Sequence, residues 1–502
     1  MLKMLSTSVQ DSPHSLEASA HVPAAAQLDA ATVTALLREG LGEQAAQLGD
    51  GDWRELSAVS MGFSGSRVAT IELLGDGGGG CAPRHLVLKA TARTVGAGAK
   101  VQRVRRSHTN ECGFLRAHAV ALAAPPTACP IPRPLLARTA RPGGAGGSGE
   151  RALGHAVLME ALRAPAWEQH ALLPTPLVGA ALGWLARFHA HFAALAGAAR
   201  TGGGGTAWMW EQMWEQGMDP GRRADAAQLR ALPAALERFA ASCAADPAAG
   251  RAALYFGDAV RARRLGERLR DASEHISARL LAASRTVVHG DFKQANLFFE
   301  TGVAAAQRLG AKQAHQRAAD PTRLVAAIDF QWTGPGCGAT DLAYLCGCAL
   351  PDEAVADWEA RVLRPYHGEL LAALRQPLAR VTAPPPFEQL LLEFKLAHLD
   401  WFRWVGAAVL PGLAPASMRA LAQSGDINRG QYAKDLGRME WAWRRAEEFL
   451  DELYPVMEAG GGAAGGQPGR GGTLSTTSVA VLTTVAPVVP AAAVTFPALR
   501  KA

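Results

Sequence analysis

One short segment, VVHGDFKQANLFF at positions 287–299, limits the fold and the chemistry of this chain more than any other part. Apolar residues stand on both sides of a polar stretch that carries His289, Asp291 and Asn296. Short apolar runs bounded by turn residues are typical of buried strands. We therefore expect these three polar side chains on a turn between two short strands.

A further aspartate, Asp329, ends the apolar run Leu324–Ile328. Asp329 and Asn296 offer the oxygen ligands that Mg²⁺ prefers in proteins. Asp291 can then take a proton from an acceptor hydroxyl, and its five-residue step to Asn296 is the one found in the catalytic loop of protein kinases. This set predicts phosphoryl transfer, where positioning and charge neutralisation supply most of the catalysis.

The motif HGDFKQAN, followed by IDFQ and then DLAY, resembles the aminoglycoside phosphotransferase and choline kinase superfamily. Gln331 after Asp-Phe makes the chain most similar to the ecdysteroid-kinase-like branch, the CHK kinase-like group. The resemblance covers about residues 55 to 455 and is most specific over 287–346. It implies an α+β, bilobal protein-kinase-like fold, with a small β-rich N-terminal lobe and a larger, mainly helical C-terminal lobe.

The resemblance also implies roles for residues of the C-terminal lobe. Asp291 matches the catalytic base, and His289 matches the histidine that braces its loop. Asn296 and Asp329 match the Mg²⁺ ligands, and Asp341 matches a buried aspartate that steadies the catalytic loop from the next helix.

In the N-terminal lobe the resemblance places Lys89 on the ATP phosphates and Glu111 as its partner. Gly62 and Gly65, in MGFSGS, match the loop that covers the nucleotide, and Glu160 lies at the hinge where adenine is read through the backbone. The covering loop is not a full GxGxxG. The alternatives are an ordinary surface lysine at Lys89, a solvated charge at Glu111 and a plain turn at the glycines.

The chain divides into segments of different composition. We predict a disordered start at 1–28, the N-terminal lobe at 29–160, the C-terminal lobe at 161–458 and a disordered tail at 459–502. Residues 301–323 look like a surface insertion, which makes the gap between Asn296 and Asp329 longer than the family usually shows.

Periodicity predicts the elements within the lobes. In the first lobe we expect a helix over Asp29–Leu41, a hairpin within Leu56–Lys89, a helix over Asn110–Leu122 and a strand over Ala156–Glu160, with a Pro-punctuated stretch (CPIPRPLL) between the last two. In the second lobe we expect helices over Leu182–Ala194, 225–283, 353–375 and Phe387–Val409, and a last one ending near Val456.

Charge and cysteine content narrow the partners and the compartment. The formal charge of +6 is thin for 502 residues, and its one basic cluster, Lys100–Arg106, is typical of a solvated helix start. We expect no nucleic-acid partner and no membrane span. Seven cysteines without a CxxC pair favour a reducing compartment. We expect a cytoplasmic protein, with an organelle address at 1–28 as the alternative and the oligomeric state left open.

These observations predict a small-molecule kinase that uses ATP and Mg²⁺ and phosphorylates a hydroxyl of a small substrate. The alternative from another class is a pseudokinase that binds without turnover, although such proteins usually lose the base or a metal ligand. A protein kinase is disfavoured because the chain has HGD in place of HRD and no APE-like segment.

The acceptor is predicted from the helix stretch HLDWFRWVGAAVL, which has one acid, one arginine and three large aromatic residues. That mix suits a lipophilic or choline-like alcohol, with Trp401 and Trp404 as substrate contacts. The alternative is that these tryptophans only pack the helical lobe.

Overall fold

The computed structural model describes residues 28–61, 66–74, 85–92, 99–125, 127–139, 153–200, 209–210, 213–215, 217, 226–283, 285–302, 304, 324–375 and 385–455. The described residues belong to one compact unit. Their fold is α+β, with a sheet before residue 160 and mainly helices after it, as the sequence predicts. The predicted disordered ends, apart from Leu28, and all but a few residues of the predicted insertion lie outside the described residues.

Within the described residues, the N-terminal sheet has five antiparallel strands in the order β1-β2-β3-β5-β4. They are β1 Trp53–Met61, β2 Ser66–Leu73, β3 His85–Ala92, β4 Pro134–Thr139 and β5 Leu153–Glu160. The β2–β3 pair confirms the predicted hairpin. β5 ends at Glu160, where the sequence places the end of the first lobe; the lobe division itself stays a prediction.

Alternation along β3 decides where its side chains lie. Leu86, Leu88 and Ala90 are buried in a core shared with α1 (Ala30–Leu41), whose Asp29 caps it by accepting from the backbone N–H of Thr32 at 2.7 Å. Lys89 therefore lies on the opposite face of the sheet.

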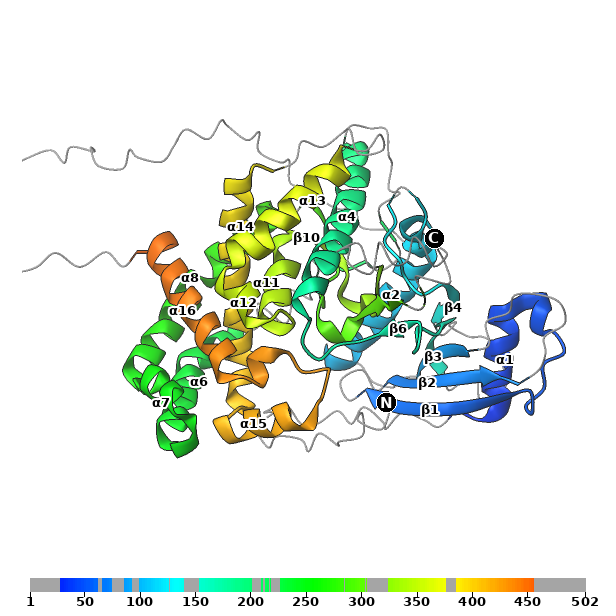
Figure 1. The fold of residues 1–502 in the computed structure, drawn as a ribbon, viewed down its shortest axis with the longest axis horizontal. Helices are drawn as coiled ribbons and strands as arrows, with labels where there is room; N and C mark the ends of the chain where they lie inside the picture. The colour runs from blue at the N-terminus through cyan, green and yellow to red at the C-terminus, as the bar shows by residue number, and fades with distance from the viewer. Residues whose placement is uncertain are drawn as a thin grey trace, which may run out of the picture. The chain divides into compact units, whose positions relative to one another are not determined.

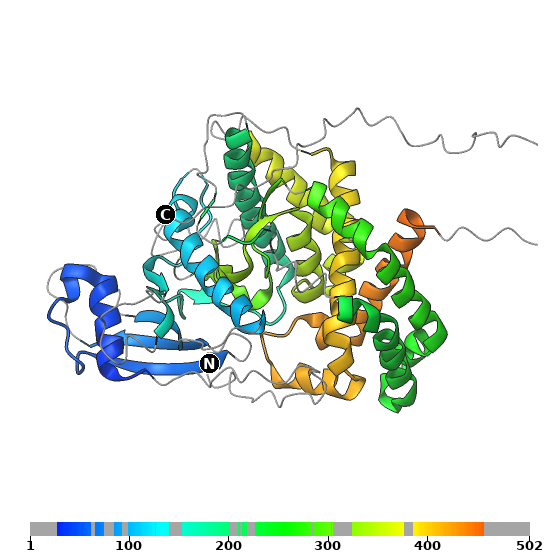
Figure 2. The ribbon, with the colours of Figure 1, turned by 180° about the vertical axis from the view of Figure 1, so that it is seen from behind.

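Helix α2 (Ala99–Ala123) lies between the sheet and the helical region in both ribbon views (Figures 1 and 2). The helix predicted from Asn110 begins eleven residues earlier, at Ala99. Val101 and Val104 are buried three residues apart, so the apolar stripe continues through the basic cluster Lys100–Arg106 and keeps it helical.

The strand β4 is a second difference from the sequence prediction, because it begins inside the Pro-punctuated stretch. It is an edge strand that pairs only with β5 within the described sheet. Pro134 stands at its first position, where a missing N–H costs no ladder hydrogen bond.

Helices build the remainder around a large apolar core. They are α4 Thr175–Arg200, α6 Ala226–Ala245, α7 Arg251–Phe256, α8 Ala259–Ala282, α11 Ala339–Cys348, α12 Asp352–Ala356, α13 Arg364–Leu374, α14 Phe387–Trp404, α15 Pro415–Ser424 and α16 Leu436–Leu453. The predicted helical stretches are confirmed, although 225–283 is divided into α6, α7 and α8. The helix α15 was not among the predicted elements.

Two small sheets hold the polar turns of the C-terminal region. β7 (Thr286–Val288) pairs with β10 (Gly334–Gly336). β8 (Leu297–Glu300) lies between β6 (Trp167–Glu168) and β9 (Val325–Ala327). The strands β7 and β8 stand on either side of the HGDFKQAN turn, as its apolar flanks predict.

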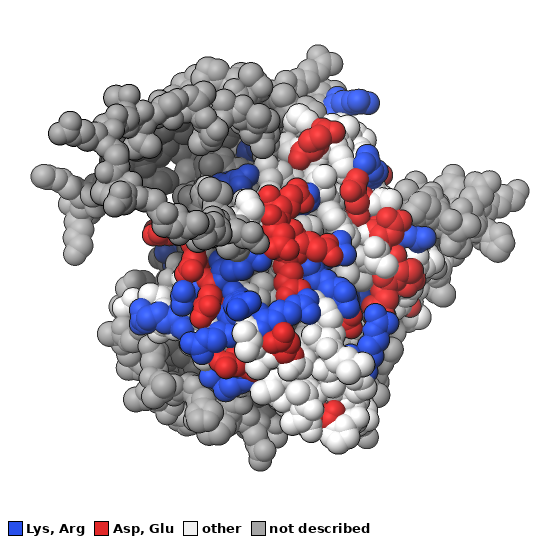
Figure 3. Space-filling view, turned by 90° about the vertical axis from the view of Figure 1, so that its left-hand side faces the viewer, with Lys and Arg blue, Asp and Glu red and all other residues white. Residues whose placement is uncertain are grey.

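Surface charge, the cysteines and the hydropathy of the helices can be compared with the predicted partners and compartment. The face formed around α8 and α16 mixes basic and acidic side chains (Figure 3), which pair across the two helices as Arg268 with Asp451 at 2.7 Å. All six described cysteines are free and buried. Among the described helices, no single one is long and apolar enough to cross a membrane, and one pair bent by 94° passes on length and composition alone.

Candidate active site

Three charged side chains from distant parts of the chain meet on the inner face of the sheet. The Nζ atom of Lys89 lies 2.8 Å from Oδ1 of Asp329 and 3.0 and 2.9 Å from the two carboxylate oxygens of Glu111. Lys89 and Glu111 are buried. The surface and solvated alternatives for these two residues are therefore not what the structure shows.

The charges of these groups shift one another's pKa. Burial acts to lower the pKa of Lys89, but Asp329 and Glu111 together outweigh it and leave it above its ordinary value. Burial acts to raise the pKa of Asp329, and Lys89 outweighs that effect, so its pKa is lowered. Burial raises the pKa of Glu111 against the opposing effect of Lys89. The ammonium group thus favours an ionised Asp329.

Asp341, on α11, stabilises the turn that carries Asp291. The carboxylate of Asp341 is fully buried and accepts from the backbone N–H of His289 at 2.7 Å and of Gly290 at 2.9 Å. It also lies 3.1 Å from Nε2 of His189, whose other ring nitrogen is 2.7 Å from the Tyr366 hydroxyl. The two backbone N–H groups of the turn have this carboxylate as their partner.

His289 ties the same turn to the strand before Asp329. Its Nε2 lies 3.0 Å from the carbonyl oxygen of Ile328, which can only accept, so Nε2 carries the proton. Nδ1 then accepts from the backbone N–H of Asp291 at 3.3 Å. Burial lowers the pKa of His289, which favours this neutral ring.

Asp291 is surrounded by donors. Its Oδ2 accepts from Nζ of Lys293 at 2.8 Å and from Nδ2 of Asn296 at 3.0 Å. These donors hold the carboxylate of Asp291 in one orientation. Burial and, to a smaller extent, the negative charge of Asp291 hold the pKa of Tyr344, on α11, well above its usual range.

The turn after Asp329 is anchored to α2. Asp329 has a left-handed backbone with φ of 67°, a conformation that costs energy for most residues with a side chain. The amide nitrogen of Asn110 donates to the carbonyl oxygens of Phe330, Gln331 and Thr333 at 2.9–3.1 Å. These contacts hold the turn that follows Asp329.

The oxygen groups around Asn296 fit a hard cation. Nδ2 of Asn296 donates to the backbone oxygen and the carboxylate of Asp291, so its Oδ1 is left as an acceptor. The backbone oxygen of Asn296 accepts from the N–H of Ile328, which places Asn296 beside Asp329. Amide and carboxylate oxygens are ligands that Mg²⁺ prefers in proteins. Among the described residues there is no group of three or more His, Cys, Asp or Glu that could hold a metal ion.

The other site residues predicted from the sequence lie in different surroundings. Gly62 and Gly65 lie outside the described residues. Glu160 is half-exposed, 3.6 Å from Nε of Arg133. Trp401 is 1% exposed and packs against His398 and Tyr432, which is the packing alternative and leaves no surface for a substrate. Trp404 is partly exposed, with its ring centre 6.1 Å from that of Tyr344.

Three side chains of the site were not predicted from the sequence. Lys293 and Tyr344 stand inside the quoted motifs HGDFKQAN and DLAY, so their position beside Asp291 had a local signal. Asn110 contacts a turn some 220 residues away, and nothing near it in the sequence indicates that contact.

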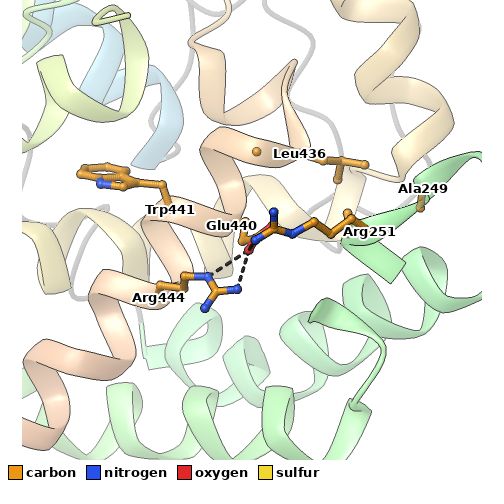
Figure 4. Close-up of a pocket in the computed structure, with 8 residues that line it drawn as sticks. Ala249, Arg251, Leu436, Glu440, Trp441 and Arg444 are labelled. Carbon is orange, nitrogen blue, oxygen red and sulfur yellow. Dashed lines mark hydrogen bonds and ion pairs between the residues drawn. The ribbon is translucent and has the colours of Figure 1, made fainter. Parts of the chain in front are cut away.

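A separate surface pocket of about 530 Å³ lies between α7 and α16 (Figure 4). Its lining includes Arg251, Leu436, Glu440, Trp441 and Arg444, and none of the residues above. Both arginines lie close to Glu440, at 3.8 Å for Arg251 and 2.6 Å for Arg444. The pocket thus adds nothing to the site around Asp291.

No family model and no curated protein matches the chain. Among solved structures it is similar to a choline kinase from Cryptosporidium parvum Iowa II (7% identity, 85% of this chain and 98% of the other, TM-score 0.42). It is also similar to a Plasmodium vivax ethanolamine kinase (10%, 81% and 83%, TM-score 0.34) and to a microcompartment-associated aminopropanol kinase (14%, 84% and 98%, TM-score 0.42).

Proposed function

We propose that this chain is a small-molecule kinase, which transfers the γ-phosphoryl group of ATP to a hydroxyl group of a small alcohol in a Mg²⁺-dependent reaction. One observation carries the proposal. Lys89 is paired with both Glu111 and Asp329. Asp291 and Asn296 are hydrogen-bonded to each other, and the backbone oxygen of Asn296 accepts from the N–H of Ile328, the residue before Asp329. A buried cation, a base and oxygen ligands are thus gathered in one place, as phosphoryl transfer requires.

Each side chain has a task that follows from its position. Lys89, held by Glu111, would bind phosphate oxygens of ATP. Mg²⁺ held by Asn296 and Asp329 would neutralise phosphate charge. Asp291 would take the proton of the acceptor hydroxyl as the acceptor oxygen bonds to the γ-phosphorus, and the bond from that phosphorus to the β–γ bridging oxygen breaks to release ADP.

Lys293 adds a positive charge beside the base. Its ammonium is 2.8 Å from Asp291 and also interacts with Asp329. Burial acts to lower its pKa, but the two carboxylates outweigh burial and raise it. We propose that Lys293 orients Asp291 and balances charge on the transferred group.

The acceptor is proposed to have a lipophilic body. Trp404 lies beside Tyr344, and the charge of Asp291 contributes to the raised pKa of Tyr344, so an apolar group at Trp404 would bring a hydroxyl toward the proposed base. A choline-like acceptor is the other prediction for this site. Asp400, the acid of the same helix, is buried and already paired with Arg403. This pairing argues against a choline-like acceptor, whose cationic group would need a carboxylate.

The test is substrate-dependent ADP production by the purified full chain with Mg²⁺ and ATP. The panel should include lipophilic alcohols, sterols, amino alcohols and aminoglycosides. Asp291→Asn should lower turnover by about 10²–10⁴-fold, and Asp258→Asn, at an exposed helix cap, is the matched control that should leave it unchanged.

The alternative is a pseudokinase. It would bind Mg·ATP and release no ADP with any alcohol of the panel, and that outcome would replace the proposed activity by a binding role. The presence of Lys89, Asp291, Asn296 and Asp329 in one constellation favours the enzyme.

A further inference from the structure

A row of buried polar side chains crosses the sheet on the same face as Lys89. Ser66 on β2, Thr91 on β3 and His155 on β5 lie opposite one another in the register of the three strands, and all three are buried. Oγ of Ser66 lies 2.8 Å from Oγ1 of Thr91 and 3.2 Å from Nε2 of His108, which is on α2. The row therefore joins the sheet to α2 through polar side chains.

His155 is the member of this row whose ring nitrogens have no partner. The residue is 1% exposed, and within the described chain neither Nδ1 nor Nε2 makes a hydrogen bond. Most buried polar side-chain atoms do make one. The ring of His108 stacks on that of His155, with the ring centres 4.4 Å apart and the planes inclined by 16°. This stacking restricts the ring of His155 to one plane, so a partner has to lie at its edge.

The atom at that edge is the second carboxylate oxygen of Glu111. Nε2 of His155 lies 3.5 Å from Oε2 of Glu111. This oxygen is also buried and receives no hydrogen bond, although Nζ of Lys89 is 2.9 Å away. An N–H···O hydrogen bond needs about 2.7–3.2 Å between its heavy atoms. A buried nitrogen and a buried oxygen, both without a hydrogen bond, thus lie just beyond hydrogen-bond distance of each other.

The protonation of the two groups suits such a bond. Burial and then the positive charge of Lys89 lower the pKa of His155 to about 3, so the ring is neutral and carries one proton. The oxygen of Glu111 beside Nε2 favours the tautomer with the proton on that nitrogen. Burial raises the pKa of Glu111, and a donor to its carboxylate favours the ionised form. His155 can therefore donate, and Glu111 gains from accepting.

We propose that His155 is a positioning residue that acts on Lys89 through Glu111. The ammonium of Lys89 has three N–H donors, and here they face the two oxygens of Glu111 and Oδ1 of Asp329. When Lys89 turns toward the phosphate groups of ATP, Oε2 of Glu111 loses its contact with the ammonium. Nε2–H of His155 then donates to Oε2 and keeps the carboxylate in place. This inference rests on the proposed kinase function and concerns the ATP side of the same site.

The competing explanation is that His155 only fills space between the sheet and α2. Its two unpartnered nitrogens would then only lower stability, because a buried polar atom without a hydrogen bond is destabilising. Under this explanation His155→Phe, which keeps a ring that can stack on His108, raises the free energy of unfolding and leaves the affinity for ATP unchanged. The two explanations therefore differ in ATP affinity, which can be measured apart from stability.

The first experiment measures Mg·ATP binding to the full chain by calorimetry. We expect His155→Phe to weaken ATP binding and to raise KM for ATP about tenfold, the loss of one hydrogen bond to a charged group, with KM for the alcohol unchanged. His155→Gln, whose amide can also donate, should retain part of the affinity. His398→Phe is the matched control and should bind ATP like the parent, because His398 is a fully buried histidine on α14 whose Nε2 lies 2.9 Å from the carbonyl oxygen of Ala442.

The second experiment asks whether His155 acts through Glu111. In a double-mutant cycle with Glu111→Gln, the loss of ATP affinity caused by His155→Phe should largely disappear, because the charged acceptor of the bond is already gone. ¹⁵N NMR of the histidine rings in the unaltered chain, without nucleotide, gives a readout that does not depend on activity. We expect the proton of His155 on Nε2. Melting temperatures show whether each variant is folded.

The outcomes separate the two proposals. Unchanged ATP affinity in folded His155→Phe, or fully additive losses in the cycle with Glu111→Gln, overturns the role of His155 and leaves the kinase in place. If His155→Phe does not fold, the tautomer in the unaltered chain decides, and a proton on Nδ1 overturns the proposal. If the unaltered chain binds ATP but releases no ADP with any alcohol, the kinase function fails, and the affinities still decide the role of His155. A chain that binds no ATP would remove both.

Discussion

Asp341→Asn is the sharpest test of how the catalytic turn is held, because it changes one atom and leaves the volume intact. The carboxylate of Asp341 accepts hydrogen bonds from three donors. Oδ2 accepts from the backbone N–H of His289 and from Nε2 of His189, and Oδ1 accepts from the backbone N–H of Gly290. If the asparagine oxygen takes the place of Oδ2, its NH₂ group faces the N–H of Gly290. That N–H is buried and loses its acceptor.

The cost follows from these contacts. An unsatisfied buried donor costs about 1–3 kcal/mol, and the remaining contacts fall from charge-assisted to neutral hydrogen bonds, which adds roughly 1–2 kcal/mol. We expect Asp341→Asn to lower the free energy of unfolding by about 2–5 kcal/mol, a large part of the usual total of about 5–15 kcal/mol. Turnover should fall as well, while the affinity for Mg·ATP changes less, because the base moves and Lys89 does not.

Urea unfolding followed by fluorescence measures the first effect, and ADP release with calorimetric ATP binding measures the second. Asp258→Asn is again the control: Asp258 accepts from the backbone N–H of Arg261 at 2.9 Å, and asparagine is an equally good helix cap. A loss in Asp341→Asn no larger than in Asp258→Asn would refute the bracing role.

Three further predictions concern the site and the core. Asp291→Asn should lower kcat by about 10²–10⁴-fold with nearly unchanged ATP affinity, since the base acts on the acceptor; turnover within about tenfold of the parent would contradict it. Asp329→Ala should abolish Mg²⁺-dependent ATP binding in calorimetry, and an unchanged affinity would count against the metal assignment. Burial lowers the pKa of His118 and His398 to about 4 and of His155 to about 3. These histidines take up protons in the unfolded chain at a higher pH than in the folded chain. The free energy of unfolding should therefore fall as the pH drops from about 7 to about 5, by up to about 2 kcal/mol for each ring. Urea titrations at several pH values measure this, and a free energy of unfolding that does not change with pH would show that these rings are not buried in the neutral form.

The sequence predicts best what lies within one short segment. Asp291 and Asn296 share a turn with strong apolar flanks, so both their secondary structure and their contact with each other could be anticipated. Lys89 and Glu111 needed the family resemblance, because one lies in a strand and the other in a distant helix, and neither segment carries a local sign that they pair. Their contact at 2.9–3.0 Å is observed, and their roles stay predictions.

Other parts could not be predicted because their cause lies far away in the sequence. The start of α2 at Ala99 depends on burial of Val101 and Val104 in the assembled fold. Trp401 and Trp404 look alike in the sequence, yet one is buried beside Gly347, where an added Cβ would be 2.1 Å from its ring, and the other is partly exposed.

Two consecutive residues of α2 explain why the distant halves of the site come together. Glu111 holds Lys89, and Asn110, turned about 100° around the helix, donates to the turn after Asp329. The indole N–H of Trp210 donates to Oδ1 of Asn110 at 2.8 Å; because an indole can only donate, the amide NH₂ must face that turn. The helix therefore fixes Lys89 on one side of Asp329 and the following turn on the other. Any displacement of α2 would separate Lys89 from Asp329, so the arrangement of the whole site depends on where this one helix packs.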